Sequence, residues 1–343
     1  MPPDPSRRLT QRDIARLAGV SQTTVSLVLN NRADAESRIP AETRDRVLRV
    51  IRETGYVADP AARRLAARRN RILGVFTYEP VFPSATGDFY HPFLVGIEES
   101  AEHRGCDLLL FTSAPVVDGR KRVYHQDHRL RLADGCVLLG RELDREDLTR
   151  LVSERYPFVS VGRRDDAGGP VPYVGADYRA AVRELVDRAR ALGHERVAYL
   201  GQGTGPESYV DRYRGYAEAV PAPVLVAPGD PAATLDRLLA AGATAVLSEE
   251  YADAVALAGQ ARGRGLSVPG DLSIVTLGDP TRPVPTDIDF TGFLIPRREM
   301  GRQAVEDLTE LIEGGTPLQR LLPCEYARGA TLAAPTHAKG PSA

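Results

Sequence analysis

The fold is decided by the stretch Thr10-Gln-Arg-Asp-Ile-Ala-Arg-Leu-Ala-Gly-Val-Ser-Gln-Thr-Thr-Val-Ser-Leu-Val-Leu-Asn30. Its spacing predicts two short helices joined by a tight turn. Ala15 supplies a small residue where the helices touch, Gly19 can adopt the positive φ of the turn, and Val25 can pack the second helix onto the first. Such a helix-turn-helix is typical of proteins that place the second helix in the major groove of DNA. A helical hairpin with a solvated polar face is the alternative.

The helix ends support this interpretation independently. Thr10 and Asp13 fit a capping box, and Ser21 can cap the second helix. Val28 and Leu29 extend the apolar stripe that begins at Val25, so the other side of the second helix should point outward. The outward residues are short and polar, as contacts to bases and phosphates require: Gln22, Thr23, Thr24 and Ser26.

Charge is distributed unevenly along the chain. The formal net charge is -2, but residues 1–70 hold fourteen arginines against eight acidic residues, a balance of +6. The remaining residues carry thirty basic against thirty-eight acidic groups, a balance of -8. The N-terminal head is therefore expected to meet a polyanion, with an affinity that falls as salt rises.

A short basic segment follows the head. Asp59 and Pro60 favour a helix start, but a helix of about ten residues is marginal on its own in water. Its four arginines, which phosphates would shield from one another, are Arg63, Arg64, Arg68 and Arg69. Leu65 is the only large apolar residue among them, and a flexible linker is the alternative interpretation.

From Arg71 onward, short apolar runs alternate with amphipathic helices, which predicts parallel sheets. The expected strands are 72–78, 108–111, 136–139, 158–161, 197–200, 224–226, 245–247, 272–277 and 321–326. The expected helices, after one at 41–53 in the head, are 92–104, 143–155, 177–192, 207–219, 231–241, 251–264 and 297–313. Two consecutive sets of this kind predict two doubly wound α/β subdomains, with a ligand crevice beyond the carboxyl ends of the strands.

Several classes of protein are disfavoured. No apolar run is long enough for a membrane span and no signal peptide is recognisable, so we expect a cytoplasmic protein that associates with the nucleoid. Cys106, Cys136 and Cys324 lack paired spacing, so neither a disulfide nor a metal site is expected. Gly201-Gln-Gly-Thr-Gly205 lacks the spacing of a dinucleotide-binding loop, and no catalytic triad is evident. We therefore expect no enzyme activity and no cofactor.

The chain resembles the LacI-type (lactose repressor-like) bacterial transcription regulators over nearly its whole length. The resemblance rests on motifs that occur in the family's order: residues 13–30, Thr43-Arg-Asp-Arg-Val47, Gly55-Tyr56, Ala62-Arg-Arg-Leu65, His91-Pro-Phe-Leu-Val-Gly-Ile-Glu98, Leu192-Gly-His-Glu-Arg-Val197, Arg212-Tyr-Arg-Gly-Tyr216, Val268-Pro-Gly-Asp-Leu-Ser-Ile274 and Met300-Gly-Arg302.

The resemblance implies an organisation in four parts. Residues 1–58 would form the DNA-binding head and 59–70 a hinge helix, while 336–343 would be a disordered tail. The body, 71–335, would resemble periplasmic binding proteins, with subdomains of roughly 71–162 plus 293–318 and 163–292 plus 319–335. Because residues 331–343 hold no leucine heptad, a dimer is expected and not a tetramer.

The resemblance also implies how DNA would be held. A homodimer would bind a pseudo-palindromic operator, its paired hinge helices would enter the central minor groove, and Leu65 would act as the wedge that kinks the duplex. Ala62 and Arg63 would lie against that groove, and Thr10, Ser21, Leu27 and Asn30 would join the head's contacts. Leu27 stands where many relatives carry an arginine that reads guanine, which predicts a different half-site.

In relatives, a small effector, usually a sugar or nucleobase, lies between the subdomains. The matching positions here are Phe89, His91, Arg212, Glu250 and Asp279. Departures from the family's pattern at Gly278, Glu250, Tyr251 and Ile295 leave the effector open, although a sugar or related metabolite fits best.

We therefore expect a DNA-binding transcriptional regulator, in most such cases a repressor. The effector would act by shifting the population between two orientations of the subdomains. A cytoplasmic solute-binding protein without a regulatory role, and a repressor that needs no effector, remain the alternatives.

Overall fold

The computed structural model describes residues 9–29, 39–56, 70–78, 89–117, 120–124, 129–280 and 284–336. The chain divides into two compact units, residues 1–70 and 71–343, here called the head and the body. Among the described residues, no helix combines the length and the apolar character that crossing a membrane demands.

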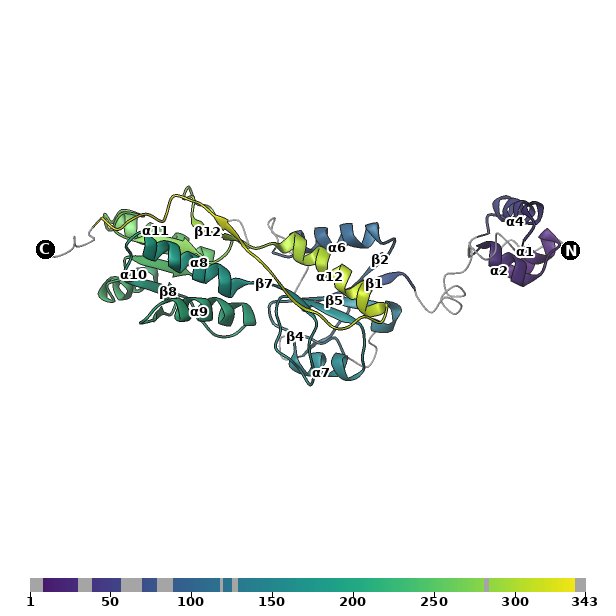
Figure 1. The fold of residues 1–343 in the computed structure, drawn as a ribbon, viewed down its shortest axis with the longest axis horizontal. Helices are drawn as coiled ribbons and strands as arrows, with labels where there is room; N and C mark the ends of the chain where they lie inside the picture. Colours follow the sequence, from purple (N-terminus) through teal and green to yellow (C-terminus); the bar gives the residue numbers. More distant parts are fainter. Residues whose placement is uncertain are drawn as a thin grey trace. The chain divides into compact units, whose positions relative to one another are not determined.

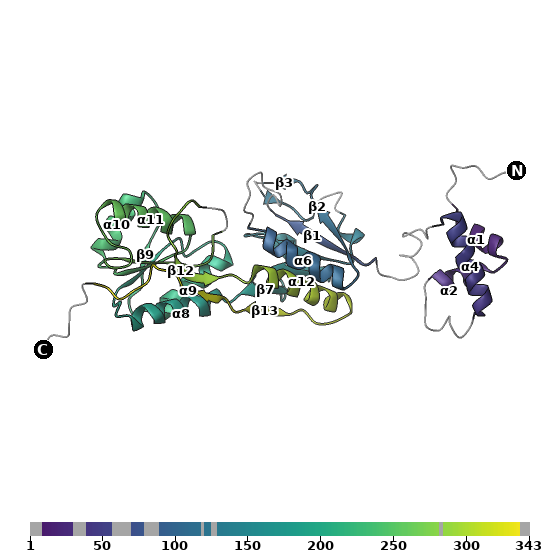
Figure 2. The same cartoon turned by 90° about the horizontal axis from the view of Figure 1, so that it is seen from above.

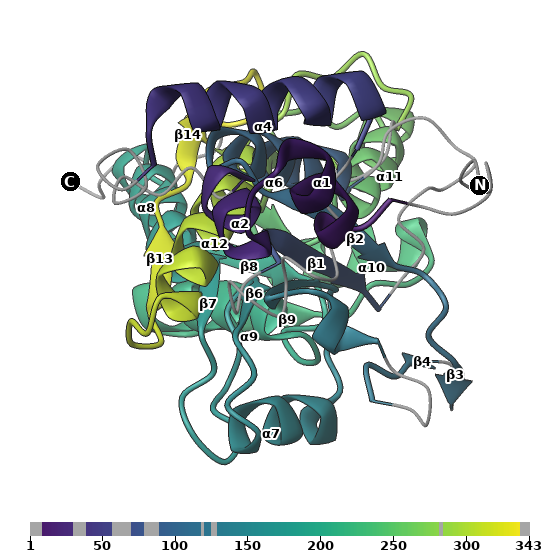
Figure 3. The same ribbon diagram turned by 90° about the vertical axis from the view of Figure 1, so that its right-hand side faces the viewer.

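The described residues of the head form the three predicted helices, α1 (Gln11–Ala18), α2 (Gln22–Leu29) and α4 (Ala41–Thr54). Ile14, Val25 and Val47, one from each helix, are fully buried where the three meet. Gly19 has φ 64° and ends α1, so the turn has the positive φ that its glycine suggested. Figure 3 shows α4 lying across α1 and α2.

The first lobe of the body contains a six-stranded parallel sheet in the order β13-β7-β6-β5-β1-β2. Its strands are β1 (Ile72–Thr77), β2 (Asp107–Phe111), β5 (Gly135–Leu139), β6 (Phe158–Val161), β7 (Tyr173–Ala176) and β13 (Gln319–Leu322). Helices α6 (His91–His103) and α12 (Arg297–Ile312) cover one face, and α7 (Arg145–Ser153) lies on the other (Figure 1). This lobe also contains the hairpin of β3 (Val116–Val117) and β4 (Arg120–Lys121), and the 3-10 helix Leu130–Leu132.

The second lobe repeats the plan with strand order β14-β12-β11-β10-β8-β9. Its strands are β8 (Val197–Leu200), β9 (Val224–Val226), β10 (Ala245–Ser248), β11 (Ser273–Thr276), β12 (Thr291–Leu294) and β14 (Glu325–Ala327). Its helices are α8 (Tyr178–Ala191), α9 (Glu207–Ala219), α10 (Pro231–Ala240) and α11 (Tyr251–Gly263). All pairs are parallel except β12 with β14. The predicted α/β class is thus confirmed.

Three crossovers join the lobes, between β7 and α8, between β12 and α12, and between β13 and β14 (Figure 1). The subdomain boundaries expected from the sequence, 71–162 plus 293–318 and 163–292 plus 319–335, therefore need correction. Strand β7 continues the first sheet by pairing with β6, and β13 pairs with β7. The single strand expected at 321–326 is wrong, because the chain changes sheets at Pro323 and Cys324.

Helices α6 and α12 lie side by side in two views (Figures 1 and 2). A Cβ atom at Gly301 would lie 2.2 Å from the carbonyl oxygen of Phe93, and one at Gly96 would lie 1.9 Å from the carbonyl oxygen of Arg298. The two helix backbones can approach this closely only because neither position carries a side chain.

We predict that Gly301→Ala lowers the free energy of unfolding of the body by about 1–3 kcal/mol, because backbone and not a flexible side chain would have to move. Gly259→Ala, in α11, is the matched control. Its Cβ would meet nothing within 4 Å, so it should raise stability by about 0.5–1 kcal/mol. Urea unfolding of both variants tests this, and equal midpoints would contradict it.

Candidate functional site

The N-terminal end of α2 is held by side-chain caps. Ser21 Oγ accepts a hydrogen bond from the Thr24 amide at 3.1 Å and lies 2.8 Å from Thr24 Oγ1. In α1, Thr10 Oγ1 accepts from the Asp13 amide at 3.3 Å, while the Thr10 amide donates to Asp13 Oδ2 at 2.9 Å. The capping box and the Ser21 cap predicted from the sequence are therefore present. They fix the start of each helix at a defined residue.

The outer face of α2 is polar and accessible. Ser21, Gln22 and Thr23 are exposed. Thr24, Ser26 and Leu27 are half-buried beside them, and Val25 and Val28 point into the core. The face thus presents hydroxyl and amide groups on a rigid helix. The other DNA-contacting residues expected from the sequence, Asn30, Ala62, Arg63 and Leu65, lie outside the described residues.

Exposed basic side chains lie on α1 and α4. The exposed arginines among the described residues of the head are Arg12, Arg16, Arg46, Arg49 and Arg52. Arg16 lies 3.7 Å from Asp13, a distance at which an exposed pair contributes little. These five side chains are accessible to an external polyanion.

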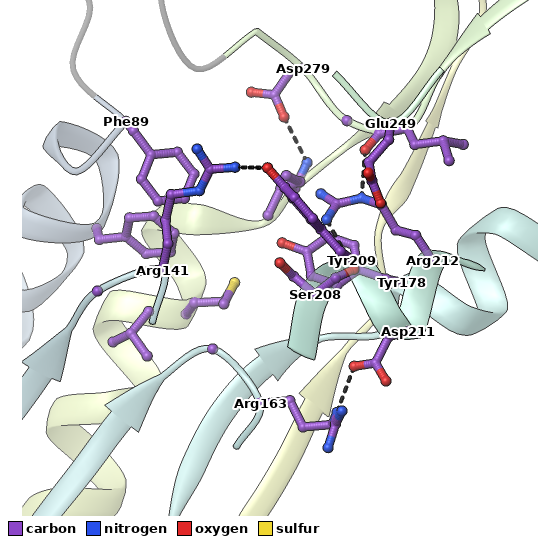
Figure 4. A pocket seen from close by; sticks show the side chains of 18 of the residues that line it. Phe89, Arg141, Arg163, Tyr178, Ser208, Tyr209, Asp211, Arg212, Glu249 and Asp279 are labelled. Carbon is purple, nitrogen blue, oxygen red and sulfur yellow. Dashed lines mark hydrogen bonds and ion pairs between the residues drawn. The ribbon is translucent and has the colours of Figure 1, made fainter. Parts of the chain in front are cut away.

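The body contains a crevice at the carboxyl ends of its parallel strands, where the topology predicts a ligand site (Figure 4). Residues that follow β5, β6, β10 and β11 line it, from both lobes. Four of the five predicted effector residues are among them: Phe89, Arg212, Glu250 and Asp279. The open volume is about 90 Å³, well below the roughly 300–1,000 Å³ of a pocket that encloses a drug-sized ligand.

Arg212 lies in the middle of this crevice and is buried. Its Nε donates to the Leu277 carbonyl at 2.8 Å and its Nη1 to the Ser208 carbonyl at 3.1 Å. The guanidinium carbon lies 3.8 Å from the centre of the Tyr178 ring. Among the described residues, no carboxylate lies within 4.0 Å of the guanidinium nitrogens, so uncharged groups hold this charge in place.

Glu249 lines the crevice but was not predicted from the sequence, which pointed to its neighbour Glu250. Its carboxylate accepts from the Tyr199 hydroxyl at 2.7 Å and from the Gln202 amide at 2.7 Å. Burial and the nearby Glu249 charge raise the pKa of Tyr199, so this hydroxyl stays protonated and remains a donor. The carboxylate is thus fixed at the strand end beside Arg212.

Glu250 extends from the second lobe toward the first. Its Oε1 lies 3.0 Å from Arg141 Nη2 and also accepts from the Tyr209 hydroxyl. Figure 4 shows Arg141 directed toward Tyr209. Arg141 and Tyr209 were not predicted from the sequence, although Arg141 comes two residues after a predicted strand, which was the available signal.

Asp279 and Phe89 both contact the start of α12. Asp279 accepts from the Ile295 amide at 3.1 Å and pairs with Arg297, whose guanidinium carbon lies 5.2 Å from the centre of the Phe89 ring. His91 is different. It is exposed at the first residue of α6 and is not among the residues lining the crevice. The helix start places His91 outside, so the structure lends its predicted role no support.

Among the described residues, no group of three or more His, Cys, Asp or Glu side chains is arranged to hold a metal ion. Burial raises the pKa of the Cys136 thiol, and the same effect raises the pKa of Cys324 to about 12. Neither cysteine is therefore a reactive thiolate at neutral pH.

Two family models match the chain. The model described as "Bacterial regulatory proteins, lacI family" matches residues 10–59, and the "Periplasmic binding protein-like domain" matches residues 186–332. The HTH-type transcriptional regulator CelR of Thermobifida fusca is 30% identical over 331 residues, covering 90% of this chain and 94% of that protein. The repressor CytR of Escherichia coli is 28% identical over 346 residues, covering 95% of this chain and 97% of CytR.

Solved structures agree with these matches. The lac repressor dimer bound to operator and an anti-inducer has a TM-score of 0.69 at 21% identity, and covers 96% of this chain and 100% of the repressor chain. A CelR-cellobiose complex has a TM-score of 0.59 at 26% identity, covering 94% of this chain and 100% of CelR. Head, body and their order along the chain all correspond, so this protein belongs to the LacI family of bacterial transcriptional regulators.

Proposed function

We propose that this protein is a dimeric, effector-responsive regulator that binds a pseudo-palindromic operator, in the manner of a repressor. The observation that carries the proposal is the joining of two sites in one chain. A capped helix presents an exposed polar face on a basic head, and a crevice between two lobes surrounds a fixed guanidinium. Neither site alone requires the other, whereas a ligand-controlled DNA-binding protein needs both. Action on DNA places the protein in the cytoplasm, at the nucleoid.

Base readout is assigned to the exposed start of α2. Gln22 can form paired hydrogen bonds to adenine, and Thr23 can donate, accept or place its methyl group against thymine. The half-buried Leu27 offers only apolar contact and cannot form paired hydrogen bonds to guanine. The protein therefore lacks the roughly 1–3 kcal/mol by which such a contact favours guanine over other bases. We therefore propose a half-site that differs from that of relatives with arginine at this position. Ser21 and Thr10 are held in caps, which suits them to orient amides toward phosphates.

The segment 59–70 is assigned to the operator's central minor groove, with Leu65 as the wedge and Ala62 and Arg63 beside it. This assignment rests on the sequence and the family. Wedge insertion costs a few kcal/mol of unstacking, which contacts to a bent duplex offset. Two copies of the chain are needed, since one head covers one half-site.

The effector is assigned to the crevice, as a sugar or related polyhydroxylated metabolite. A guanidinium held by two carbonyls and a ring face can donate to hydroxyl oxygens without leaving its place. Glu249, Glu250 and Asp279 supply carboxylate acceptors on the same lobe as Arg212, and the rings of Phe89, Tyr178 and Tyr209 supply apolar surface. The relative CelR has been solved with cellobiose. The small present volume favours a second candidate as well, a repressor that acts without an effector.

Selection from a random duplex library tests the DNA-binding assignment. The full chain should recover a pseudo-palindrome and prefer it to random competitor by at least about 10³-fold, with an affinity that falls steeply as salt rises. Gln22→Ala should relax the preference at one base pair in each half-site. Gln260→Ala, on α11 of the body, is the control and should select the same sequence as the unaltered chain. Recovery of unrelated sequences would contradict the assignment.

A thermal-shift screen with cellobiose, other mono- and disaccharides and nucleosides tests the crevice. A ligand at a hundred times its Kd stabilises the protein by about 2.7 kcal/mol, which is a readily measured rise in Tm. Arg212→Ala should abolish the shift, whereas Arg214→Ala, on the exposed side of the same helix, should keep it. A shift that survives Arg212→Ala places the ligand elsewhere, and the absence of any shift favours the effector-free repressor.

A further inference from the structure

Four ion pairs link the two lobes around the crevice, each between an arginine and a carboxylate. All of the paired cations are arginines of the first lobe or of its helix α12: Arg141, Arg163, Arg164 and Arg297. Each of them pairs with a carboxylate of the second lobe, in the same order Glu250, Asp211, Glu207 and Asp279, and Arg163 also pairs with Asp165 of its own lobe at 2.7 Å. Every one of these four ion pairs therefore joins one lobe to the other.

Two of the pairs lie behind the crevice, between the end of β6 and helix α9. Arg163 Nε lies 2.5 Å from Asp211 Oδ2, and Arg164 Nη1 lies 3.1 Å from Glu207 Oε2. Arg164 Nη1 also donates to the carbonyl of Arg163 at 2.9 Å. The Arg163 to Asp211 pair is visible in Figure 4. Glu207 and Asp211 lie one helical turn apart, so one face of α9 is held by two consecutive arginines.

The other two pairs lie at the front and at a crossover. Arg141 reaches Glu250 at 3.0 Å, and the Tyr209 hydroxyl contacts both side chains. Arg297 is the first residue of α12 and pairs with Asp279, which also accepts from the Ile295 amide between the lobes. Charge pairs thus occupy the back, the front and the hinge of the crevice.

Burial makes the rear pairs stronger than surface pairs. The side chains of Arg163 and Asp211 are 18% and 12% exposed, and that of Arg164 is 4% exposed. Water and salt screen such pairs weakly, so their attraction exceeds that of an exposed pair. The arrangement also has a cost. The buried Nε atoms of Arg164 and Arg297 have no hydrogen-bond partner, and desolvation lowers the pKa of Arg164.

We infer that these four pairs form an ionic latch that holds the two lobes closed in the absence of a ligand. The open volume of the crevice is small because the lobes are closed. A ligand can enter only after at least some of the four ion pairs separate. The unsatisfied arginine nitrogens mean that closure is opposed from within, which keeps the latch reversible. The regulatory meaning of the latch rests on the proposed function, but closure itself involves neither ligand nor DNA.

The lobe separation can be measured directly by electron paramagnetic resonance. Cysteines introduced by Arg145→Cys in α7 and Leu239→Cys in α10 would carry spin labels on the two lobes. Cys106→Ser and Cys324→Ser remove the accessible thiols, while Cys136 is fully buried. Diluting the labelled full chain with unlabelled chain leaves one labelled protomer per dimer. The latch predicts a single short distance without any ligand.

Charge reversal should then open the lobes. Arg163→Asp and Asp211→Arg should each raise the population at longer distances by about tenfold or more, and the double swap should restore the short distance. Arg141→Ala, at the more exposed front pair, should give a smaller opening without the folding risk of a buried charge. Asp287→Arg, which reverses an exposed pair with Arg262 inside the second lobe, is the control and should change nothing.

The latch is overturned if single reversals, folded by circular dichroism, keep the distance of the unaltered chain, or if the double swap stays open. Because no ligand or operator is present, either result leaves the proposed function standing. Conversely, loss of DNA binding or of a ligand shift leaves the measured latch intact.

Discussion

Parallel strand order is the constraint on which the rest of the body depends. In each lobe the principal strands run the same way, so the loops after β5, β6, β10 and β11 emerge at one edge of each sheet and meet in one crevice. Three crossovers then tie the lobes together at that edge. Polar residues that would otherwise be solvated at strand ends are brought face to face. The strand topology therefore determines where the crevice lies, and the side chains determine what it can bind.

Charged side chains line much of the crevice. Removing one partner of a buried ion pair costs about 3–5 kcal/mol, whereas an exposed pair contributes about 0–1 kcal/mol. Loss of one partner should therefore cost more at the rear pairs, Arg163 with Asp211 and Arg164 with Glu207, than at the front, where Arg141 and Glu250 are 44% and 40% exposed. Arg212 differs from all of them because uncharged groups hold it. Four arginines thus serve closure, while the fifth keeps its charge for a ligand.

Much of this could be predicted from the sequence. The head depends on local signals, namely caps at Thr10 and Ser21 and a glycine turn, and local signals are readable. Strands β7 and β12 were missed because Tyr173–Ala176 and Thr291–Leu294 are only four residues long and include glycine, which weakens a strand pattern. The chain's change of sheet at Pro323 depends on partners that lie far away in sequence, and no local pattern reports them.

The site shows the same division. Arg212, Glu250 and Asp279 were found because they match a motif or follow a predicted strand. Arg163 and Arg164 also follow a predicted strand, but nothing in the sequence pairs them with Asp211 and Glu207 on a helix more than forty residues later. His91 was suggested by its place in a motif, and the helix start turns it to the outside. The ion pairs between the lobes depend on the tertiary structure, which local sequence patterns do not report.

In the regulator proposed above, the arrangement of the lobes sets the affinity of the head for DNA. The most direct test is the Kd of the full chain for its selected operator, measured by fluorescence anisotropy for the unaltered protein, Arg163→Asp, Asp211→Arg and the double swap. Each single reversal should shift the Kd by at least about fivefold, the lower range of allosteric coupling, and the double swap should restore the Kd of the unaltered protein. Equal Kd values in variants whose lobes have opened would contradict this prediction.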